Sequence, residues 1–250
     1  PVSSPSSVVT MALKLKPGHR VTDYYQDATA VTRVADDFLA RHKDSRFFLL
    51  LHYMDPHDPY FPHPYTGEGI ARVEADNPDP SHAAHMRELY DGEIRFTDEI
   101  LGKILDVLRA RGMQDDTLTV ITADHGEEFF EHNGKGHQKT LFDEVVRVPL
   151  VLHWPGQLPA GHVVSDQVRS IDLMPTLLGV ARASKLPQMQ GRDILPLAQR
   201  SALPPQSAML ELHADGQDQR ALRTRELKAY ARGAAQGRRA REFAYDLLRD

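Results

Sequence analysis

The sequence contains no cysteine among its 250 residues and a single tryptophan. The lack of cysteine excludes disulfide scaffolds, Cys-ligated zinc, iron–sulfur centres and a cysteine nucleophile within these residues. It does not fix the compartment, because a secreted protein can also lack disulfides. No apolar run is long enough to cross a bilayer, so the chain encodes no transmembrane helix. The longest apolar stretches are Phe47–Leu51 and Val148–Leu152.

The chain also lacks a surplus of basic charge. Its 30 Lys and Arg face 35 Asp and Glu, for a formal net charge of −5. This balance gives no reason to expect a nucleic-acid partner. A hydrophobic content of 41% excludes wholesale disorder, and the length predicts one large domain or one domain with an appendage.

Residue patterns predict an alternating α/β order. Apolar spacing predicts helices, and short β-branched or continuous apolar runs predict strands. We therefore expect an α/β domain with a mostly parallel central sheet over residues 21–200, after a lead-in over 1–20. Short strands after residue 206 predict a small antiparallel subdomain over 201–250. The expected helices are Thr22–His42, Ser81–Arg111 and Ile171–Ala183; the expected strands are Arg46–Tyr53, Thr117–Thr122, Val148–Trp154, Ala208–His213, Ala221–Arg225 and Leu227–Ala231, with 242–248 left ambiguous.

An acid and an imidazole follow the predicted strand Thr117–Thr122. Asp124 and His125 stand at its exit, and Gly126 allows the backbone to turn sharply there. Open α/β sheets place ligands at the carboxyl ends of strands. A carboxylate with an imidazole suits Zn, Mn, Fe or, with more oxygens, Ca. Two adjacent residues cannot complete a metal shell, and the alternative is a turn that caps the next helix.

Two further loops carry groups that suit an anion. His57 lies between prolines after the predicted strand Arg46–Tyr53, and a stiffened imidazole can donate to an anion or act as acid or base. Residues 131–140 combine glycines with Lys135, His137 and Lys139, which is how a site for a tetrahedral oxyanion is built. The alternatives are a solvent-exposed histidine and a mobile surface loop.

Five segments, taken in order, resemble the sulfatase family of the alkaline phosphatase superfamily. The resemblance implies a three-layer sandwich with a mostly parallel central sheet and a small C-terminal antiparallel sheet. It covers residues 22–250, including a tail similar to the closing strands of the family. The segments are FFLLLHYMDPHDPY (47–60), LYDGEIRFTDEILGKILDVLRARG (89–112), TLTVITADHGEEFFEHNGKGHQKTLFDEVVRVPLVLHWPG (117–156), IDLMPTLLGV (171–180) and GRDILPL (191–197).

The resemblance implies roles for five residues. Asp124 and His125 match the downstream metal-ligand pair of the family, and His57 matches the histidine that contacts the bound sulfate or phosphate. Lys139 or His137 matches a basic group that acts on the substrate, in a register that leaves both open. The implied metal is Ca²⁺ for a sulfatase and Mn²⁺ or Zn²⁺ for a phosphoryl-transfer relative.

The family pattern is missing in one place. Family members carry an N-terminal acidic pair and a Cys-x-Pro-x-Arg or Ser-x-Pro-x-Arg word, whose first residue becomes formylglycine. This chain has no Cys, and its Ser3–Ser7 stretch lacks both the Arg and the acidic pair. Formylglycine therefore cannot form from Cys in these residues, and we expect the chain to be the C-terminal part of a longer enzyme.

We expect this chain to form part of a metal-dependent sulfuric ester hydrolase that acts on a small anionic ester. One alternative is a phosphodiesterase, a phosphonate hydrolase or a phosphoglycerol or phosphoethanolamine transferase of the same superfamily. Another is a non-catalytic fragment of the fold. The resemblance leaves the compartment open between periplasm, membrane-tethered ectodomain and cytoplasm, and the sequence does not indicate an oligomeric state.

Overall fold

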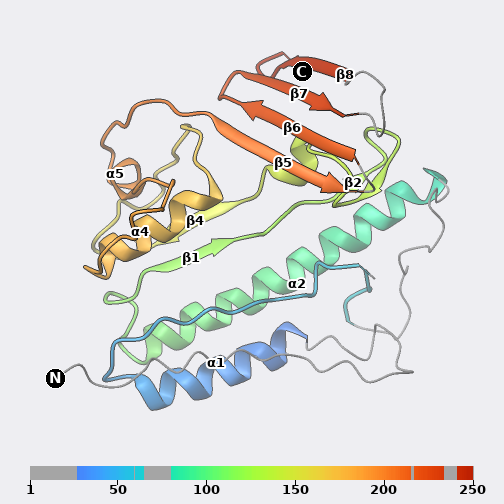
Figure 1. Ribbon diagram of the computed structural model, residues 1–250. Helices are drawn as coiled ribbons and strands as arrows, with labels where there is room; N and C mark the ends of the chain where they lie inside the picture. The colour runs from blue at the N-terminus through green and yellow to red at the C-terminus, as the bar shows by residue number, and fades with distance from the viewer. Residues whose placement is uncertain (1–26, 59, 65–79, 215–216, 234–240, 250) are drawn as a thin grey trace. The chain divides into compact units, whose positions relative to one another are not determined.

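The computed structural model describes residues 27–58, 60–64, 80–214, 217–233 and 241–249 (Figure 1). These residues belong to two compact units, 1–116 and 117–250, and each unit is treated by itself. The Ser3–Ser7 stretch, the lead-in over 1–20 and Thr22 lie outside the described residues. The division into 1–20, 21–200 and 201–250 stays a prediction. Within the part of the chain that is described, no helix is long and apolar enough to cross a membrane.

Two helices dominate the first unit. Helix α1 spans Ala28–His42 and begins after Asp27, whose carboxylate accepts the amide of Ala30 at 2.8 Å. Helix α2 spans Ala83–Ala110 after a short 3₁₀ turn, η2, at Pro80–His82. Gly112 adopts φ 67° just past α2, and the next amide bonds back to the carbonyl of Leu108 at 2.9 Å. This left-handed glycine ends the helix close to the predicted position.

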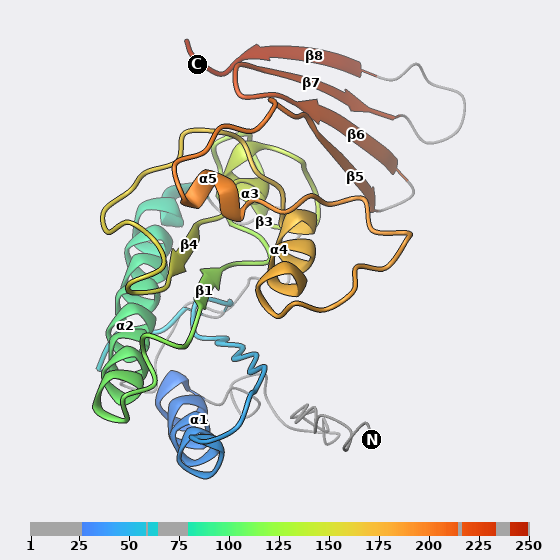
Figure 2. The ribbon, with the colours of Figure 1, turned by 90° about the vertical axis from the view of Figure 1, so that its left-hand side faces the viewer.

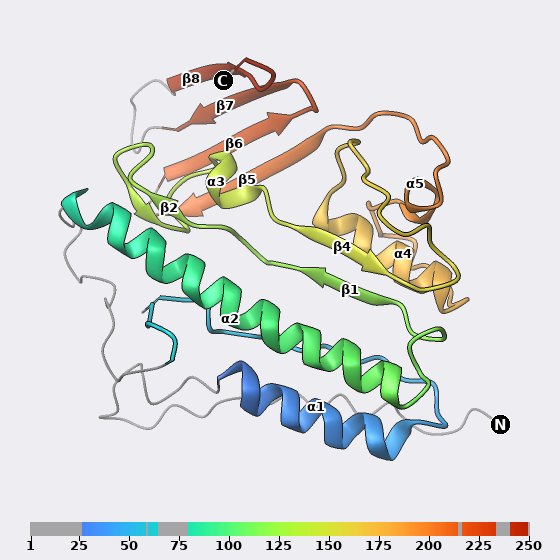
Figure 3. The same ribbon diagram turned by 180° about the vertical axis from the view of Figure 1, so that it is seen from behind.

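The core of the first unit lies between α1, α2 and the chain segment that follows α1. Figures 1 and 3 show α1 and α2 running side by side in the same direction, with that segment returning along them. Buried Leu39 and Leu108 belong to one hydrophobic cluster here. The other buried members of this cluster are Ala35, Ile104 and Met113, with Phe38, Phe47, Leu49, Leu51 and Val107 packed against them.

The predicted strand Arg46–Tyr53 is wrong as a strand, because no regular structure is assigned to these residues. The side chains still alternate as in a strand. Phe47 and Leu49 pack on the helices, whereas Phe48 and Leu50 are 70% and 77% exposed. A strand exists only with a hydrogen-bonded neighbour, and this segment is assigned none within the described residues.

The second unit begins with a two-stranded antiparallel pair. Strand β1, Thr119–Thr122, pairs with β4, Leu150–His153, in the register Ile121↔Val151. Both strands fall inside their predicted ranges. A mostly parallel central sheet in a three-layer sandwich is not confirmed, since every pairing among the described strands is antiparallel. That expectation counted residues 46–53 as a strand of the sheet.

Short elements lie between β1 and β4 in the chain, and others lie between β4 and the C-terminal sheet. A small hairpin joins β2, Glu128–Phe129, to β3, Lys135–Gly136, and α3 follows at Asp143–Val146. The predicted helix over 171–183 is confirmed as a 3₁₀ turn, η3, and α4. The turn η3 spans Ser170–Asp172 and α4 spans Leu173–Val180. The helix α5 follows at Leu195–Ala198.

The C-terminal antiparallel sheet is confirmed. Its four strands follow the order β5-β6-β7-β8, and Figure 2 shows them in sequence. On its inner face, Ala221 and Tyr230 are buried together with Leu141, which lies just before α3. The sheet therefore packs on the segment that leads into α3. The strands are β5 Ala208–Ala214, β6 Gln217–Arg223, β7 Leu227–Arg232 and β8 Arg241–Asp246.

Candidate active site

The five candidate residues are divided between the two units. His57 belongs to the first unit, and Asp124, His125, His137 and Lys139 belong to the second. The role of each, and the convergence of His57 with the other four, stay predictions. The structure shows what holds each group within its own unit.

Asp124 and His125 form a compact pair after β1. The Asp124 carboxylate accepts the His125 amide at 3.0 Å, and its Oδ2 lies 3.8 Å from His125 Nε2. His125 Nδ1 is 2.8 Å from the carbonyl oxygen of Gly126. A carbonyl can only accept, so Nδ1 carries the proton, and in the neutral ring Nε2 keeps the lone pair. The pair thus offers a cation one carboxylate oxygen and one imidazole nitrogen.

The donor set fits half of a metal shell. Asp124 is 74% exposed, and His125 is 33% exposed, so the pair is open to solvent. No group of three or more potential ligands exists among the residues that the structure describes. Asp124 and His125 alone therefore do not make up a complete set of metal ligands.

Gly126 holds this turn against α3. Its amide donates to the carbonyl of Val145 at 2.7 Å. A Cβ atom at this position would lie 2.1 Å from the carbonyl oxygen of Glu144, a distance that side chains do not tolerate. The close approach of two backbones explains why glycine follows the Asp-His pair.

His137 is stacked on His125 and is bonded to a buried acid. The two ring centroids are 3.8 Å apart. His137 Nδ1 lies 3.0 Å from Oε1 of Glu127, and both side chains are at most 5% exposed. An ionised carboxylate only accepts, so Nδ1 is the donor and the ring orientation is fixed. Sequence reasoning missed Glu127, although it stands two residues after His125.

Buried polar side chains anchor the chain between β2 and α3. Glu128 is buried and accepts the hydroxyl of Thr140 at 3.0 Å and the amide of His132 at 3.2 Å. Lys135 is also buried, whereas the side chain of Lys139 is exposed. Of the two lysines, only Lys139 therefore presents its ammonium group to a ligand from solvent.

His57 stands in a turn of the first unit. Its amide bonds to the carbonyl of Met54 at 2.9 Å, and its Nδ1 is 2.6 Å from the carbonyl oxygen of Asp58. Nδ1 therefore carries the proton, as in His125. Asp55 ties the start of this turn to α1 by accepting the amide of Ala28 at 3.0 Å.

Glu93 anchors the chain just after the His57 turn. This α2 residue is 2% exposed, accepts the amide of Phe61 at 2.7 Å and contacts His63 Nε2. The His63 ring in turn stacks on Phe96, with 4.1 Å between centroids. Burial raises the pKa of Glu93, although the hydrogen bonds from His63 and Phe61 act to lower it. The sequence patterns did not indicate a role for Glu93.

Curated proteins with similar sequences include sulfatases. The rat steryl-sulfatase (Rattus norvegicus) is 29% identical over 192 residues, which cover 70% of this chain and 30% of that protein. A multifunctional alkaline phosphatase superfamily protein from Trinickia caryophylli is 30% identical over 220 residues, covering 71% of this chain and 42% of that protein. The chain thus spans less than half the length of these relatives.

Solved structures show the same fold. A putative sulfatase from Bacteroides fragilis matches with a TM-score of 0.77 at 20% identity, over 91% of this chain and 53% of that one. A phosphonate monoester hydrolase from Silicibacter pomeroyi matches with a TM-score of 0.73 at 23% identity, over 90% of this chain and 55% of that one.

The family profile extends across most of the chain. The profile described as Sulfatase matches residues 5–183, a range that includes the His57 turn and the whole of residues 117–156. This confirms the resemblance seen in the five sequence segments. The chain belongs to the sulfatase family.

Proposed function

We propose that this chain forms part of a metal-dependent sulfuric ester hydrolase. The observation that carries the proposal is the Asp124–His125 pair, whose Oδ2 and Nε2 atoms lie 3.8 Å apart. Atoms at that separation can bind one cation together. The stacked ring of His137 lies beside this pair, so a cation and an imidazole meet at the end of β1.

Asp124 and His125 would hold the divalent metal, and Ca²⁺ is the ion expected for a sulfatase. When bound, such a cation supplies charge stabilisation and orients the nucleophile. The other half of its shell and the nucleophile come from residues beyond the described chain. The aligned part of this chain covers 30% of the rat steryl-sulfatase.

The remaining candidates act on the ester oxygens. Lys139 presents an exposed ammonium group that can neutralise negative charge on a sulfate oxygen. His57 and His137 each carry the proton on Nδ1, so in the neutral ring Nε2 is the nitrogen that keeps the lone pair. In the protonated state Nε2 donates to an anionic oxygen, and in the neutral state it accepts a proton.

A phosphate or phosphonate ester hydrolase is the second candidate. The alkaline phosphatase superfamily relative and the phosphonate monoester hydrolase neighbour favour it. Both reactions use the same tetrahedral oxyanion, so the groups in this chain serve either one. The nucleophile discriminates them, since formylglycine from Cys or Ser favours sulfate and an unmodified Thr or Ser favours phosphate. With Mn²⁺ or Zn²⁺ in place of Ca²⁺, the second candidate gains support. A non-catalytic chain that keeps the fold is the third alternative.

Hydrolysis assays separate the candidates. The protein encoded by the complete reading frame that contains this chain is assayed with 4-nitrophenyl sulfate, bis(4-nitrophenyl) phosphate and a phenylphosphonate ester. We expect sulfate hydrolysis that Asp124→Ala lowers by about 10²-fold or more and that chelation abolishes. Asp166→Asn, which changes another exposed acid of the same unit, is the matched control.

The other results contradict the proposal in distinct ways. If only the phosphorus esters are hydrolysed, the result favours the phosphate or phosphonate ester hydrolase. Rapid sulfate hydrolysis by residues 1–250 alone, lost in Asp124→Ala, contradicts the proposal that the nucleophile lies elsewhere. Full activity in Asp124→Ala contradicts the proposal that the Asp124–His125 pair binds the metal.

A further inference from the structure

The segment 137–142 carries two of the candidate residues but forms no regular secondary structure. It connects β3 to α3 and includes His137 and Lys139. Local backbone hydrogen bonds therefore do not fix its course. Its polar backbone groups must be satisfied in another way where they are buried.

Gln219 of β6 bonds to the backbone of Lys139. Its side-chain Nε2 donates to the Lys139 carbonyl oxygen at 2.7 Å. The hydroxyl of Tyr230 donates to Oε1 of the same Gln219. That bond sets the orientation of the amide, because Oε1 accepts and Nε2 must then be the group that faces Lys139. Tyr230 Oη also accepts the amide of Leu141, at 3.4 Å.

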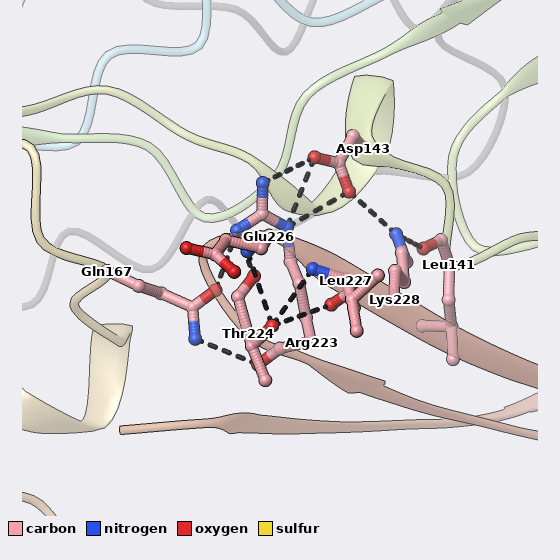
Figure 4. Close-up of polar contacts among 8 residues, drawn as sticks. All are labelled: Leu141, Asp143, Gln167, Arg223, Thr224, Glu226, Leu227 and Lys228. Atoms are coloured by element: carbon pink, nitrogen blue, oxygen red, sulfur yellow. Dashed lines mark hydrogen bonds and ion pairs between the residues drawn. The ribbon is translucent and has the colours of Figure 1, made fainter. Parts of the chain in front are cut away.

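Lys228 of β7 holds the next carbonyl along the segment. Its ammonium group donates to the carbonyl oxygen of Leu141 and to Oδ1 of Asp143, the latter at 2.8 Å. Figure 4 shows Lys228 between these two acceptors. Lys228 is 3% exposed, and a buried ammonium group is costly unless it is paired and hydrogen-bonded. Both of its acceptors lie at the end of the segment or directly after it.

A second cation fixes Asp143 itself. Arg223 of β6 donates from Nη2 to Asp143 Oδ2 at 2.7 Å and from Nη1 to Gln167 Oε1 at 2.6 Å (Figure 4). Burial acts to raise the pKa of Asp143, but the hydrogen bonds from Arg223 and Lys228 outweigh it, and the pKa lies below its usual value. Asp143 is therefore a charged anchor at neutral pH.

The inner face of the C-terminal sheet is thus unusual for a packing surface. Gln219, Lys228 and Tyr230 are each at most 3% exposed. Burying an amide and an ammonium group costs free energy that apolar side chains would not incur. Their hydrogen-bond partners at residues 139, 141 and 143 offset this cost.

We propose that Gln219, Tyr230 and Lys228 are positioning residues, through which the C-terminal sheet fixes the anion-binding segment 137–142 and sets the place of the Lys139 side chain. This inference rests on the proposed function, because it assigns Lys139 to the substrate oxyanion. None of the three touches the ester; they act through the backbone of the segment.

Two variants and a control test the inference on the full 250-residue chain. Gln219→Met keeps the length of the side chain and removes the donor to Lys139, and Tyr230→Phe removes one hydroxyl. Arg220→Met is the control, because Arg220 is adjacent to Gln219 but pairs with Glu211, both side chains being at least 65% exposed. Amide hydrogen exchange of residues 137–142 reports the positioning. The shift of the Lys139 NMR signals on titration with sodium sulfate reports the anion site.

We expect faster exchange confined to residues 137–142, by about fivefold in Gln219→Met and about twofold in Tyr230→Phe. Sulfate should bind to Gln219→Met about fivefold more weakly, and Arg220→Met should match the native chain in both readouts. Exchange in Gln219→Met equal to that of the native chain overturns the inference, as does an increase spread evenly over β5 to β8.

The sulfate titration and the hydrogen-exchange measurement test different claims. If sulfate leaves the Lys139 signals of the native chain unchanged, the anion-site role in the proposed function is contradicted. The exchange comparison then still decides whether the sheet positions the segment. If sulfate binds equally well to Gln219→Met and to the native chain, the claim that positioning sets the Lys139 side chain is overturned.

Discussion

Nδ1 of His137 lies 3.0 Å from Oε1 of Glu127, and the two side chains are buried together. The carboxylate selects one tautomer of the ring. We expect Glu127→Leu to remove this selection, so that the ¹⁵N signals of the His137 ring show a mixed tautomer population. The loss of a buried acceptor should also lower the free energy of unfolding by about 1–3 kcal/mol.

Glu127→Gln is the control for that change. Its amide oxygen still accepts the Nδ1 proton, so the native tautomer should remain dominant. If Glu127→Leu also keeps the native tautomer, the carboxylate is not what orients His137.

A weak cation site should be detectable at Asp124 and His125. Because this chain supplies two ligands, we expect a dissociation constant for Mn²⁺ on the order of 10⁻³ M, measured by electron paramagnetic resonance of the free ion. Asp124→Asn should weaken binding by at least about tenfold. The exposed Asp166→Asn serves as its control, and equal affinity in the two variants would place the bound ion elsewhere.

Gly126 should tolerate no side chain. In Gly126→Ala the new Cβ would lie 2.1 Å from a backbone oxygen, so the turn or α3 must shift. We expect a loss of about 1–3 kcal/mol in the free energy of unfolding, followed by Trp154 fluorescence. Gly102→Ala is the contrasting case, since nothing lies within 4 Å of its added Cβ in α2. It should stabilise that helix by about 0.5–1 kcal/mol.

Glu93 should make the first unit pH-sensitive. Burial raises its pKa above the ordinary 4.5, which means that the fold favours the protonated form. Its contribution to stability is fully present below pH 4.5 and is lost as the pH rises through the folded-state pKa. Glu93→Gln lacks this titration, so its unfolding free energy relative to the native chain should increase with pH.

Urea unfolding measures this difference. The transition is followed by circular dichroism, whose helical signal comes mostly from α1 and α2, at several values between about pH 4 and 8. The His63 ring contacts the Glu93 carboxylate, so the NMR signals of that ring are recorded in parallel. Glu88→Gln changes a carboxylate that is 83% exposed and should show no such trend. The absence of a trend in Glu93→Gln would refute the raised pKa.

The sequence predicted individual helices and strands better than it predicted which strands pair. Helices α1 and α2, strands β1 and β4 and the C-terminal sheet follow from apolar spacing and β-branched runs, which act over a few residues. The strand over 46–53 failed because its apolar run satisfies a strand pattern, while strand formation depends on a neighbour that the pattern does not specify.

The supporting residues of the site were harder to find. Asp124, His125 and Lys139 attract notice because acids, imidazoles and amines after a strand suggest chemistry. Glu93 and Glu127 are ordinary acids in sequence, and only burial beside a histidine gives them a role. Gln219 lies 80 positions after its partner Lys139, a separation over which no local pattern carries information.

That separation also constrains how the protein is made. The backbone groups of residues 139 and 141 are hydrogen-bonded by side chains of β6 and β7, which lie 80 to 89 positions later in the chain. A nascent chain that has already emerged with Asp124, His125 and Lys139 in place still lacks the side chains that hold the segment. The segment 137–142 therefore gains these hydrogen bonds only after β6 and β7 have been synthesised and have docked.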